Sequence, residues 1–543
     1  MFLLSTAIGG GLWQYHRSGH APSSYDVVVV GAGPGGIAAS IQAARMGAHV
    51  ALLEETDWVG GQMTAAGVGS MDEGSLAARN SGLYKEFVQN VMAYYGAQHK
   101  SVDTCYGGAS SICVDPKDGQ IILRRMLDKE SGRLQVYTGT HVSAVIKRGS
   151  VVTGVVANNK QFTSKVVIDA DEYGDILAKA GAAYRLGNGT SDNPAAQACV
   201  QDITFAAVIK KYPGGVPKQL QFKQPPPGYS QELVKHFAAL LQQNGYPAQL
   251  RPNGLSLTRR SPEAFSSYIV FRGLPDLSNP NNYDVFQKDG HSITRTSLNL
   301  GNDFPLKGQL STKYISDPAV RLQSTCQAKL LTLQFVYYIQ HDMQETSWSI
   351  ANDEGYNTPY NQGQHCAGLI GYEAFEDQMS QEPYVREGRR LIGTQTLTSG
   401  QLAVSWRDEK HIPTYADSVA VGYYPMDIHE CRAPNTLEPG LDTASDIPST
   451  HKGGAFEVPL GVLIPQTVDG LLAAEKNISV SRGANGAIRE QPITMDIGQA
   501  AGALAALSTK NHTQPRRISA GSVQSALQSS GVVTTISNKV GKL

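Results

Sequence analysis

The sequence predicts an α/β fold in which helices flank a parallel sheet and an α+β domain is inserted into the first domain. Three observations within residues 25–54 predict it. Residues 27–30 read VVVV, a β-branched run typical of a parallel strand buried on both faces. Glycines in G-x-G-x-x-G spacing follow and lead into a helix rich in small residues. A second apolar run then ends in Glu54, so the whole unit is typical of a Rossmann-like nucleotide-binding domain.

The glycine-rich turn contains five candidate site residues: Gly31, Gly33, Pro34, Gly35 and Gly36. Gly31 permits a tight turn, Gly33 lets a pyrophosphate approach the backbone, and Gly36 lets the helix pack closely on the strand. The N-terminus of the helix presents free N–H groups and the positive end of its dipole to phosphate. Glu54 stands where an acid accepts the hydroxyl groups of a ribose. The alternative is a glycine-rich turn in another α/β protein.

Two later segments supply further candidates. Gly60, Gly61 and Gln62 follow the second strand, where paired glycines allow the backbone to lie against a long cofactor. A plain glycine turn is the alternative. The apolar run 166–170 delivers Asp169 and Ala170 into an acidic turn, and the carboxyl end of such a strand is where an open α/β sheet binds its ligand. The acidic turn is also compatible with a helix N-cap, and both interpretations can hold.

At 543 residues the chain exceeds the size of a single-core domain. The closing motif reaches the first one only if the nucleotide-binding domain is discontinuous, so we expect it to comprise residues 25–75, 130–195 and 441–510. The substrate, or cap, domain is expected to comprise residues 76–129 and 196–440. Residues 511–543 are expected to form a C-terminal tail.

Composition excludes several classes of function. The net charge of −1 provides no field that would favour nucleic acid, so no nucleic-acid partner is expected. The six cysteines form no C-x-x-C or Cys/His pattern, and no metal site is expected. Cys105 and Cys113 could pair, but the sequence favours buried free thiols.

The N-terminal residues 1–24 are expected to stand outside the core. The apolar run 2–13 is shorter than the about 20 residues that span a bilayer. It lacks the basic start and the cleavage pattern of a signal peptide. A membrane anchor, a weak signal sequence and a leader all stay open, and with them the localisation: cytoplasmic, membrane-associated or exported.

Six motifs together resemble the FAD-dependent oxidoreductases of the glutathione-reductase-like fold, and more narrowly the bacterial xanthan-lyase-associated type. They are GAGPGG with Glu54, WVGGQMT, VVIDADEYGDILAKAGA, PYVREGRRLIG, DSVAVGYYPMDIHE and REQPITMDIGQAAGALAAL. The resemblance implies FAD bound non-covalently in an extended form, with Val142 beside the adenine. It implies that the ribityl chain and the ring lie near the Gly60–Gln62 segment and near three C-terminal residues, Ile493, Gly498 and Gln499.

The resemblance also implies a function: hydride transfer between a small organic substrate and FAD, with an external electron acceptor. A flavin-dependent isomerase or desaturase and a non-catalytic binding protein on the same fold are the alternatives. The chain departs from the family pattern at Glu475-Lys476, where relatives have Gly-Arg, and at Asn485, where histidine is frequent.

His429 and Arg386 are the catalytic candidates. A neutral imidazole is poised near physiological pH, so His429 is predicted to act as the base that accepts a substrate proton. A structural histidine is the alternative. Arg386 and Arg390 would share one face at helical spacing and could clamp a carboxylate or phosphate. A salt-bridged interdomain face is the alternative for this pair.

Overall fold

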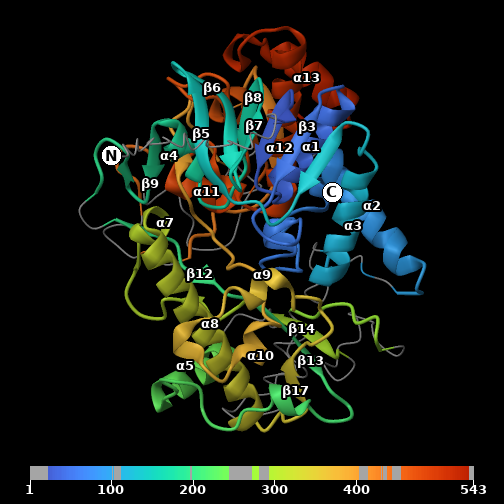
Figure 1. Cartoon of the computed structure of the whole chain (residues 1–543), viewed down its shortest axis with the longest axis vertical. Coiled ribbons are helices and arrows are strands. Elements are labelled where there is room, and N and C mark those ends of the chain that lie inside the picture. Colours follow the sequence, from blue (N-terminus) through green and yellow to red (C-terminus); the bar gives the residue numbers. More distant parts are fainter. Residues whose placement is uncertain are drawn as a thin grey trace, which may run out of the picture.

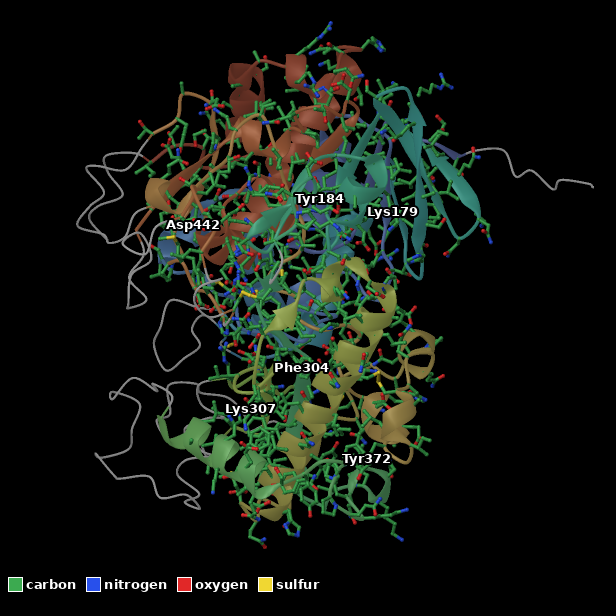
Figure 2. All side chains as sticks on the ribbon, turned by 90° about the vertical axis from the view of Figure 1, so that its left-hand side faces the viewer. Lys179, Tyr184, Phe304, Lys307, Tyr372 and Asp442 are labelled. Atoms are coloured by element: carbon green, nitrogen blue, oxygen red, sulfur yellow. A yellow bond between two sulfur atoms is a disulfide. The ribbon has the colours of Figure 1, made fainter. Side chains whose placement is uncertain are left out.

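The chain is known from a computed structural model, which describes residues 23–100, 102, 112–195, 198–243, 272–279, 293–402, 414–429, 431, 437–442 and 454–536. The predicted leader lies outside these residues apart from Ser23 and Ser24. Figure 1 shows a sheet domain in the upper half of the view and a cap in the lower half. The side chains of the two parts meet between Tyr184, in the sheet domain, and Phe304, in the cap (Figure 2).

A five-stranded parallel sheet is the centre of the sheet domain, and the Rossmann-like fold is confirmed. Its strand order is β21-β8-β2-β3-β4. The strands are β21 (Leu471–Ala473), β8 (Val166–Asp169), β2 (Val27–Val30), β3 (Val50–Leu53) and β4 (Leu134–Tyr137). All four residues of β2 are buried, as expected for a β-branched strand between two helical layers.

Two helices pack so closely on each other and on the sheet that only glycine fits between them. They are α1 (Pro34–Arg45) and α12 (Gln491–Lys510), and each carries a proline in its first turn. A Cβ atom on Gly36 would overlap the carbonyl oxygen of Gly31, and one on Gly498 would overlap that of Gly35. The small residues of the closing motif therefore bring the C-terminal helix directly against the glycine-rich turn.

A second sheet covers one edge of the domain in the order β1-β7-β6-β5. Its strands are β1 (Ser23–Ser24), β7 (Lys160–Thr163), β6 (Val151–Ala157) and β5 (Val142–Arg148). The short helix α4 (Asp175–Ala180) follows β8. Polar turns between apolar runs predict this meander, and the predicted strands 141–147 and 151–157 are confirmed.

Helices outside the predicted domain limits complete the core of the sheet domain. They are α2 (Gly82–Gly96), α3 (Pro116–Asp128) and α13 (Ala520–Ser529). Phe87 of α2, Leu123 of α3 and Leu527 of α13 belong to the hydrophobic cluster that contains the central strands. Residues 76–129 thus share the core of the sheet domain rather than that of the cap, and 511–536 contain a packed helix rather than a tail.

The cap is built on a three-stranded antiparallel sheet and one long helix. The sheet has the order β14-β13-β17, and α8 runs from Pro318 to His341, which confirms the longest predicted helix. Phe237 and Phe335 stack in the cap core with ring centroids 4.6 Å apart. The elements of the cap are β13 (Ala207–Lys211), α5 (Gln231–Gln243), β14 (Arg295–Leu298), α7 (Lys313–Ser316), β17 (Trp348–Ile350), α9 (Pro359–Gln362) and α10 (Glu373–Glu376).

Short strands connect the cap with the sheet domain. The three-stranded group is β9 (Tyr184–Leu186), β10 (Gly189–Thr190) and β18 (Arg390–Leu391). The pairs are β11 (Cys199–Val200) with β16 (Leu310–Ser311) and β12 (Ile203–Thr204) with β15 (Asp303–Phe304). A further pair, β19 (Ser418–Gly422) with β20 (Phe456–Pro459), belongs to the core of the sheet domain and packs against α12 and α13. Helix α11 (Arg482–Ile488) precedes α12. No helix among the described residues is long and apolar enough to cross a membrane.

The cysteines of the described residues are disulfide-bonded, so the expectation of free thiols is wrong. Cys199 pairs with Cys431 and Cys326 pairs with Cys366. Cys113 is also disulfide-bonded, whereas Cys105 lies outside the described residues. Spacing could not reveal a pair separated by 232 residues. The Cys199–Cys431 disulfide attaches the segment after His429 to β11.

A buried charge cluster joins α3 to the cap, and removing its cation is expected to destabilise the protein. The Arg295 guanidinium lies 2.5 Å from both Asp115 and Glu354, and the Arg295 side chain is 3% exposed. We expect Arg295→Met to lower the free energy of unfolding by about 3–5 kcal/mol, because it leaves two buried carboxylates without a counter-ion.

Urea denaturation checks this, with Arg124→Met as the control. The Arg124–Asp128 pair is exposed and its loss is expected to cost less than about 1 kcal/mol. Equal losses in both variants would contradict a dominant role for the buried cluster.

Candidate active site

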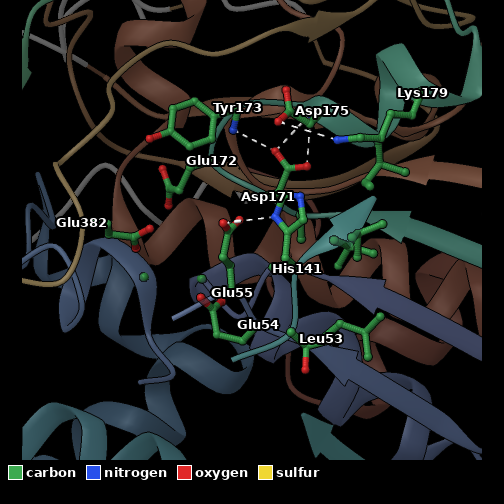
Figure 3. A pocket seen from close by; sticks show the side chains of 18 residues that line it. Leu53, Glu54, Glu55, His141, Asp171, Glu172, Tyr173, Asp175, Lys179 and Glu382 are labelled. Atoms are coloured by element: carbon green, nitrogen blue, oxygen red, sulfur yellow. Dashed lines mark hydrogen bonds and ion pairs between the residues drawn. The ribbon is translucent and has the colours of Figure 1, made fainter. Parts of the chain in front are cut away.

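A cavity opens at the carboxyl ends of the parallel strands, where the fold class places its ligand. Figure 3 shows its acidic wall, with Glu54, Glu55, Glu172 and Glu382 around one opening. Six of the predicted cofactor residues line it: Gly31, Gly33, Glu54, Gly61, Val142 and Ala170. We call this cavity the groove.

Glycine is required where the backbone forms the floor of the groove. Gly31 has a φ of +95°, and a Cβ atom on it would overlap the Ala170 carbonyl. Gly61 has a φ of +48°, and a Cβ atom on it would lie 2.8 Å from the Cα of Gly33. Left-handed backbone and the absence of a Cβ atom leave a surface of bare backbone beside the N-terminus of α1. This surface fits a diphosphate.

Glu54 is held rigidly at the edge of the groove. Its carboxylate accepts hydrogen bonds from the Ala32 N–H at 2.7 Å and from the N–H and hydroxyl of Thr56, both at 2.8 Å. Burial is the largest influence on this group and raises its pKa to about 7. A fixed carboxyl group of this kind can still accept hydrogen bonds from the hydroxyl groups of a ribose, as its predicted role requires.

The remaining predicted cofactor residues lie around the groove without lining it. Asp169 is buried beneath the floor, where its carboxylate accepts from the N–H of Leu177 at 2.7 Å and from Asn477 at 3.0 Å. Gln499 accepts from the Leu83 N–H at 2.6 Å and donates to Gln42 at 2.8 Å, so it joins α12 to α2 and α1. The others are Pro34, Gly35, Gly36, Gly60, Gln62, Ile493 and Gly498.

The residues present fit FAD. The groove offers a glycine floor for a diphosphate, Glu54 for a ribose and the apolar side chain of Val142 for an adenine. Beyond Gly61, the Gln62 side chain is buried and donates to the Arg489 carbonyl at 3.0 Å, just before α12 begins. The positive end of the α12 dipole would stabilise negative charge on a redox ring placed there.

A chain of polar contacts leads from Gln62 to His429. Arg489 donates from Nη2 to Asp427 Oδ2 at 2.9 Å, and the same oxygen lies 3.0 Å from His429 Nε2. His429 Nδ1 lies 2.9 Å from Asp303 Oδ2, and Arg386 donates to the other oxygen of Asp303 at 3.1 Å. We call Arg489, Asp427, His429, Asp303 and Arg386 the His429 network.

The ring of His429 differs from the neutral imidazole that the sequence predicts. Both ring nitrogens face carboxylates. Burial and Arg386 lower the pKa of His429, but the two aspartates outweigh them and the pKa lies above its usual value. Arg386 and His429 hold the pKa of Asp303 well below its usual range. The network therefore favours an imidazolium between two carboxylates.

Arg386 is fixed by the protein itself. The segment 384–391 is not helical, so Arg386 and Arg390 do not share a helix face, and that expectation is wrong. Arg386 is 3% exposed and also donates to the Asp202 carbonyl at 2.8 Å and to Thr204 at 2.9 Å. Arg390 instead pairs with Glu438 at 2.6 Å.

A smaller pocket lies next to the network. Its lining includes Asp72, Tyr424, Glu490 and the predicted residue Ile493. Burial raises the pKa of Glu490 to about 8, although the Arg489 guanidinium lies 2.7 Å away. Three residues of the network were not among the predicted site residues: Asp427 and Arg489, which stand in two of the motifs, and Asp303, which no motif marks.

The charge state of His429 predicts how its contribution to stability depends on pH. A group whose folded-state pKa is raised stabilises the fold fully below its unfolded pKa and loses that effect as pH rises through the folded pKa. The free energy of unfolding of the native protein should therefore exceed that of His429→Asn most at pH 6, near the unfolded value of about 6.5. The difference should shrink at pH 9.

Denaturant unfolding at pH 6 and pH 9 measures this difference. His365→Asn, which removes an exposed partner of Asp377, is the matched control. A difference that stays constant or grows with pH would show that His429 is not a buried cation.

Comparison with known proteins gives the family. The family described as FAD dependent oxidoreductase matches residues 26–527. NADH:fumarate oxidoreductase of Klebsiella pneumoniae (strain 342) is 27% identical over 30% of this chain and 21% of its own length. Digeranylgeranylglycerophospholipid reductase of Methanocella arvoryzae (strain DSM 22066 / NBRC 105507 / MRE50) is 31% identical over 27% of this chain and 39% of its own. The chain thus spans less than two fifths of the length of these relatives.

Solved structures are similar over parts of the chain. Thioredoxin reductase of T. acidophilum has a TM-score of 0.17 and 23% identity, over 27% of this chain and 34% of its own. L-Proline dehydrogenase from P. horikoshii has a TM-score of 0.26 and 13% identity, over 36% of this chain and 62% of its own. The family match spans most of the sequence and both parts of the fold, and the protein belongs to the FAD-dependent oxidoreductases.

Proposed function

We propose that this enzyme transfers hydride between a small organic substrate and bound FAD, with the substrate beside the His429 network. Gly33 in the groove would hold the diphosphate of FAD, and Gln62 and the N-terminus of α12 would lie next to its ring. A second, diffusible molecule exchanges electrons with the flavin after the substrate has left.

The contact chain from Gln62 to His429 is the observation that carries this proposal. Gln62 is predicted to lie at the flavin ring, and two contacts join it to Asp427, the carboxylate that faces His429. Side chains that hold and move protons thus lie next to the expected position of the ring. A protein that only binds FAD would not need an ionised histidine there.

Each residue of the His429 network has its own role in the proposed reaction. When bound, FAD supplies the two-electron chemistry. Asp303, fixed by Arg386 and Thr204, orients the His429 ring through Nδ1. As an imidazolium, His429 donates its Nε2 proton when substrate is reduced. When substrate is oxidised, the neutral ring, which forms as pH rises through the raised pKa of His429, accepts the substrate proton. Asp427 shares that proton and is itself held by Arg489.

Anaerobic spectroscopy of the flavin tests the proposal. Oxidised enzyme is mixed with 2-hydroxy acids and amino acids, and dithionite-reduced enzyme with α,β-unsaturated acids. We expect one class to bleach the oxidised flavin or to restore its colour. If no compound changes the absorbance while dithionite does, the proposed hydride transfer is wrong. Product formation without net flavin reduction would identify an isomerase instead.

A further inference from the structure

We infer that Glu475 is a diphosphate-binding residue that holds FAD as a neutral carboxylic acid, so that binding of FAD takes up one proton. This rests on the proposed position of FAD in the groove. Glu475 stands at one of the two places where the sequence departs from the family pattern, and among the described residues its carboxyl group accepts one hydrogen bond, from the Gly35 N–H.

The backbone fixes Glu475 at the N-terminus of α1. Glu475 opens the short 3-10 helix η10 (Glu475–Asn477) directly after β21, with a φ of +58° and a buried side chain. The Ala474 N–H donates to the Asp169 carbonyl at 2.8 Å, and Asn477 donates to the Asp169 carboxylate at 3.0 Å. These contacts on either side of Glu475 hold its left-handed backbone in place.

The carboxyl group of Glu475 occupies a phosphate position. Its Oε1 accepts a hydrogen bond from the Gly35 N–H at 2.6 Å and would lie 2.5 Å from a Cβ atom on Gly33. Gly33 has no side-chain cap and lines the groove. A helix N-terminus of this kind binds anions, so Oε1 occupies the place of one phosphate oxygen.

The second oxygen of Glu475 is buried and makes no hydrogen bond. An unpartnered buried oxygen is costly, and a protonated Oε2–H would donate to a phosphate oxygen placed against Gly33, the residue of the groove that lies next to this carboxyl group. One end of the carboxyl group would then accept from Gly35 while the other end donates to FAD. This arrangement gives both oxygens a partner.

Charges around Glu475 favour its neutral form. The Lys476 ammonium is paired with Glu172 Oε2, and the other oxygen of Glu172 has no partner. Glu382 faces the same group of charges from the cap. Burial, with a smaller contribution from Glu172, raises the pKa of Glu475 to about 7 against the opposing effect of Lys476. A diphosphate next to Glu475 would raise this pKa further.

FAD release from the holoenzyme tests the proposal without substrate. Flavin fluorescence on dilution gives the Kd between pH 6 and pH 9. Above pH 7 the Kd of the native protein should rise about tenfold per pH unit, because the flavin-free form then loses the proton that binding requires. In weak buffer at pH 8, a pH indicator should record about one proton released per FAD released.

Glu475→Gln separates protonation from hydrogen bonding. The amide still accepts from Gly35 and donates to phosphate but does not ionise, so its Kd should be flat with pH and its release proton-free. Glu457→Gln is the control, because Glu457 is a buried carboxylate that accepts two N–H groups, from Tyr415 and Ile536, outside the groove. It should retain the native slope.

A flat native profile, or a Glu475→Gln variant that keeps the slope and the released proton, would overturn the proposal. If Glu475→Gln does not fold, the proton count of the native protein decides alone. Failure of the substrate experiment leaves these results unaffected, because they measure FAD binding only.

Discussion

Gly33→Val is expected to purify without its yellow colour. The new side chain would lie against the Glu475 carboxylate and project into the groove where a diphosphate meets the backbone. Overpacking of this kind costs about 1–3 kcal/mol, equivalent to about 5- to 150-fold weaker FAD binding, and the lost contacts at the N-terminus of α1 add to it. FAD per polypeptide, from absorbance after denaturation, measures the effect.

Gly132→Val is the matched control for this substitution. Gly132 lies in an exposed turn before β4, and a Cβ atom there would meet nothing within 4 Å. This variant should keep its flavin and its melting temperature. If Gly33→Val retains stoichiometric FAD, the diphosphate does not lie at the glycine-rich turn.

His429→Asn is expected to slow flavin reduction by substrate by about 10²- to 10⁴-fold, the range for a positioned acid or base. Asparagine retains some hydrogen bonding between Asp303 and Asp427 but carries no titratable proton. Stopped-flow absorbance under anaerobic conditions measures the rate. Reduction by dithionite and FAD content should stay unchanged, because His429 does not line the groove.

The exposed residue His365 again supplies the control, because it lies in the cap and its side chain pairs with Asp377. Its reductive rate should match that of the native enzyme. A near-native rate in His429→Asn would make His429 a structural residue.

The sheet domain could be predicted because local sequence specifies it. A β-branched run such as 27–30 is typical of a buried parallel strand. The spacing of Gly31, Gly33 and Gly36 predicts a tight turn that larger residues cannot adopt. Pro492 likewise marks the start of α12. These signals depend on neighbours a few residues away, so they can be read without the structure.

The site around His429 could be predicted only in part, because tertiary contacts decide it. Asp303 reaches the ring from β15, 126 positions away, and no motif marks it. Two carboxylates on one imidazole reverse the charge state that an isolated histidine would have. Arg386 lies in a segment that is not helical, whereas its spacing from Arg390 resembles that of a helix. Long-range pairs such as Cys199–Cys431 leave no pattern in the sequence.

A crystal structure of the yellow holoenzyme tests the central claim most directly. We expect the diphosphate of FAD against Gly33 and Gly35, the adenine beside Val142, and the flavin ring beside Gln62 and the N-terminus of α12, on the side of His429. Flavin density outside the groove, or a ring separated from Gln62 and the His429 network, would contradict it.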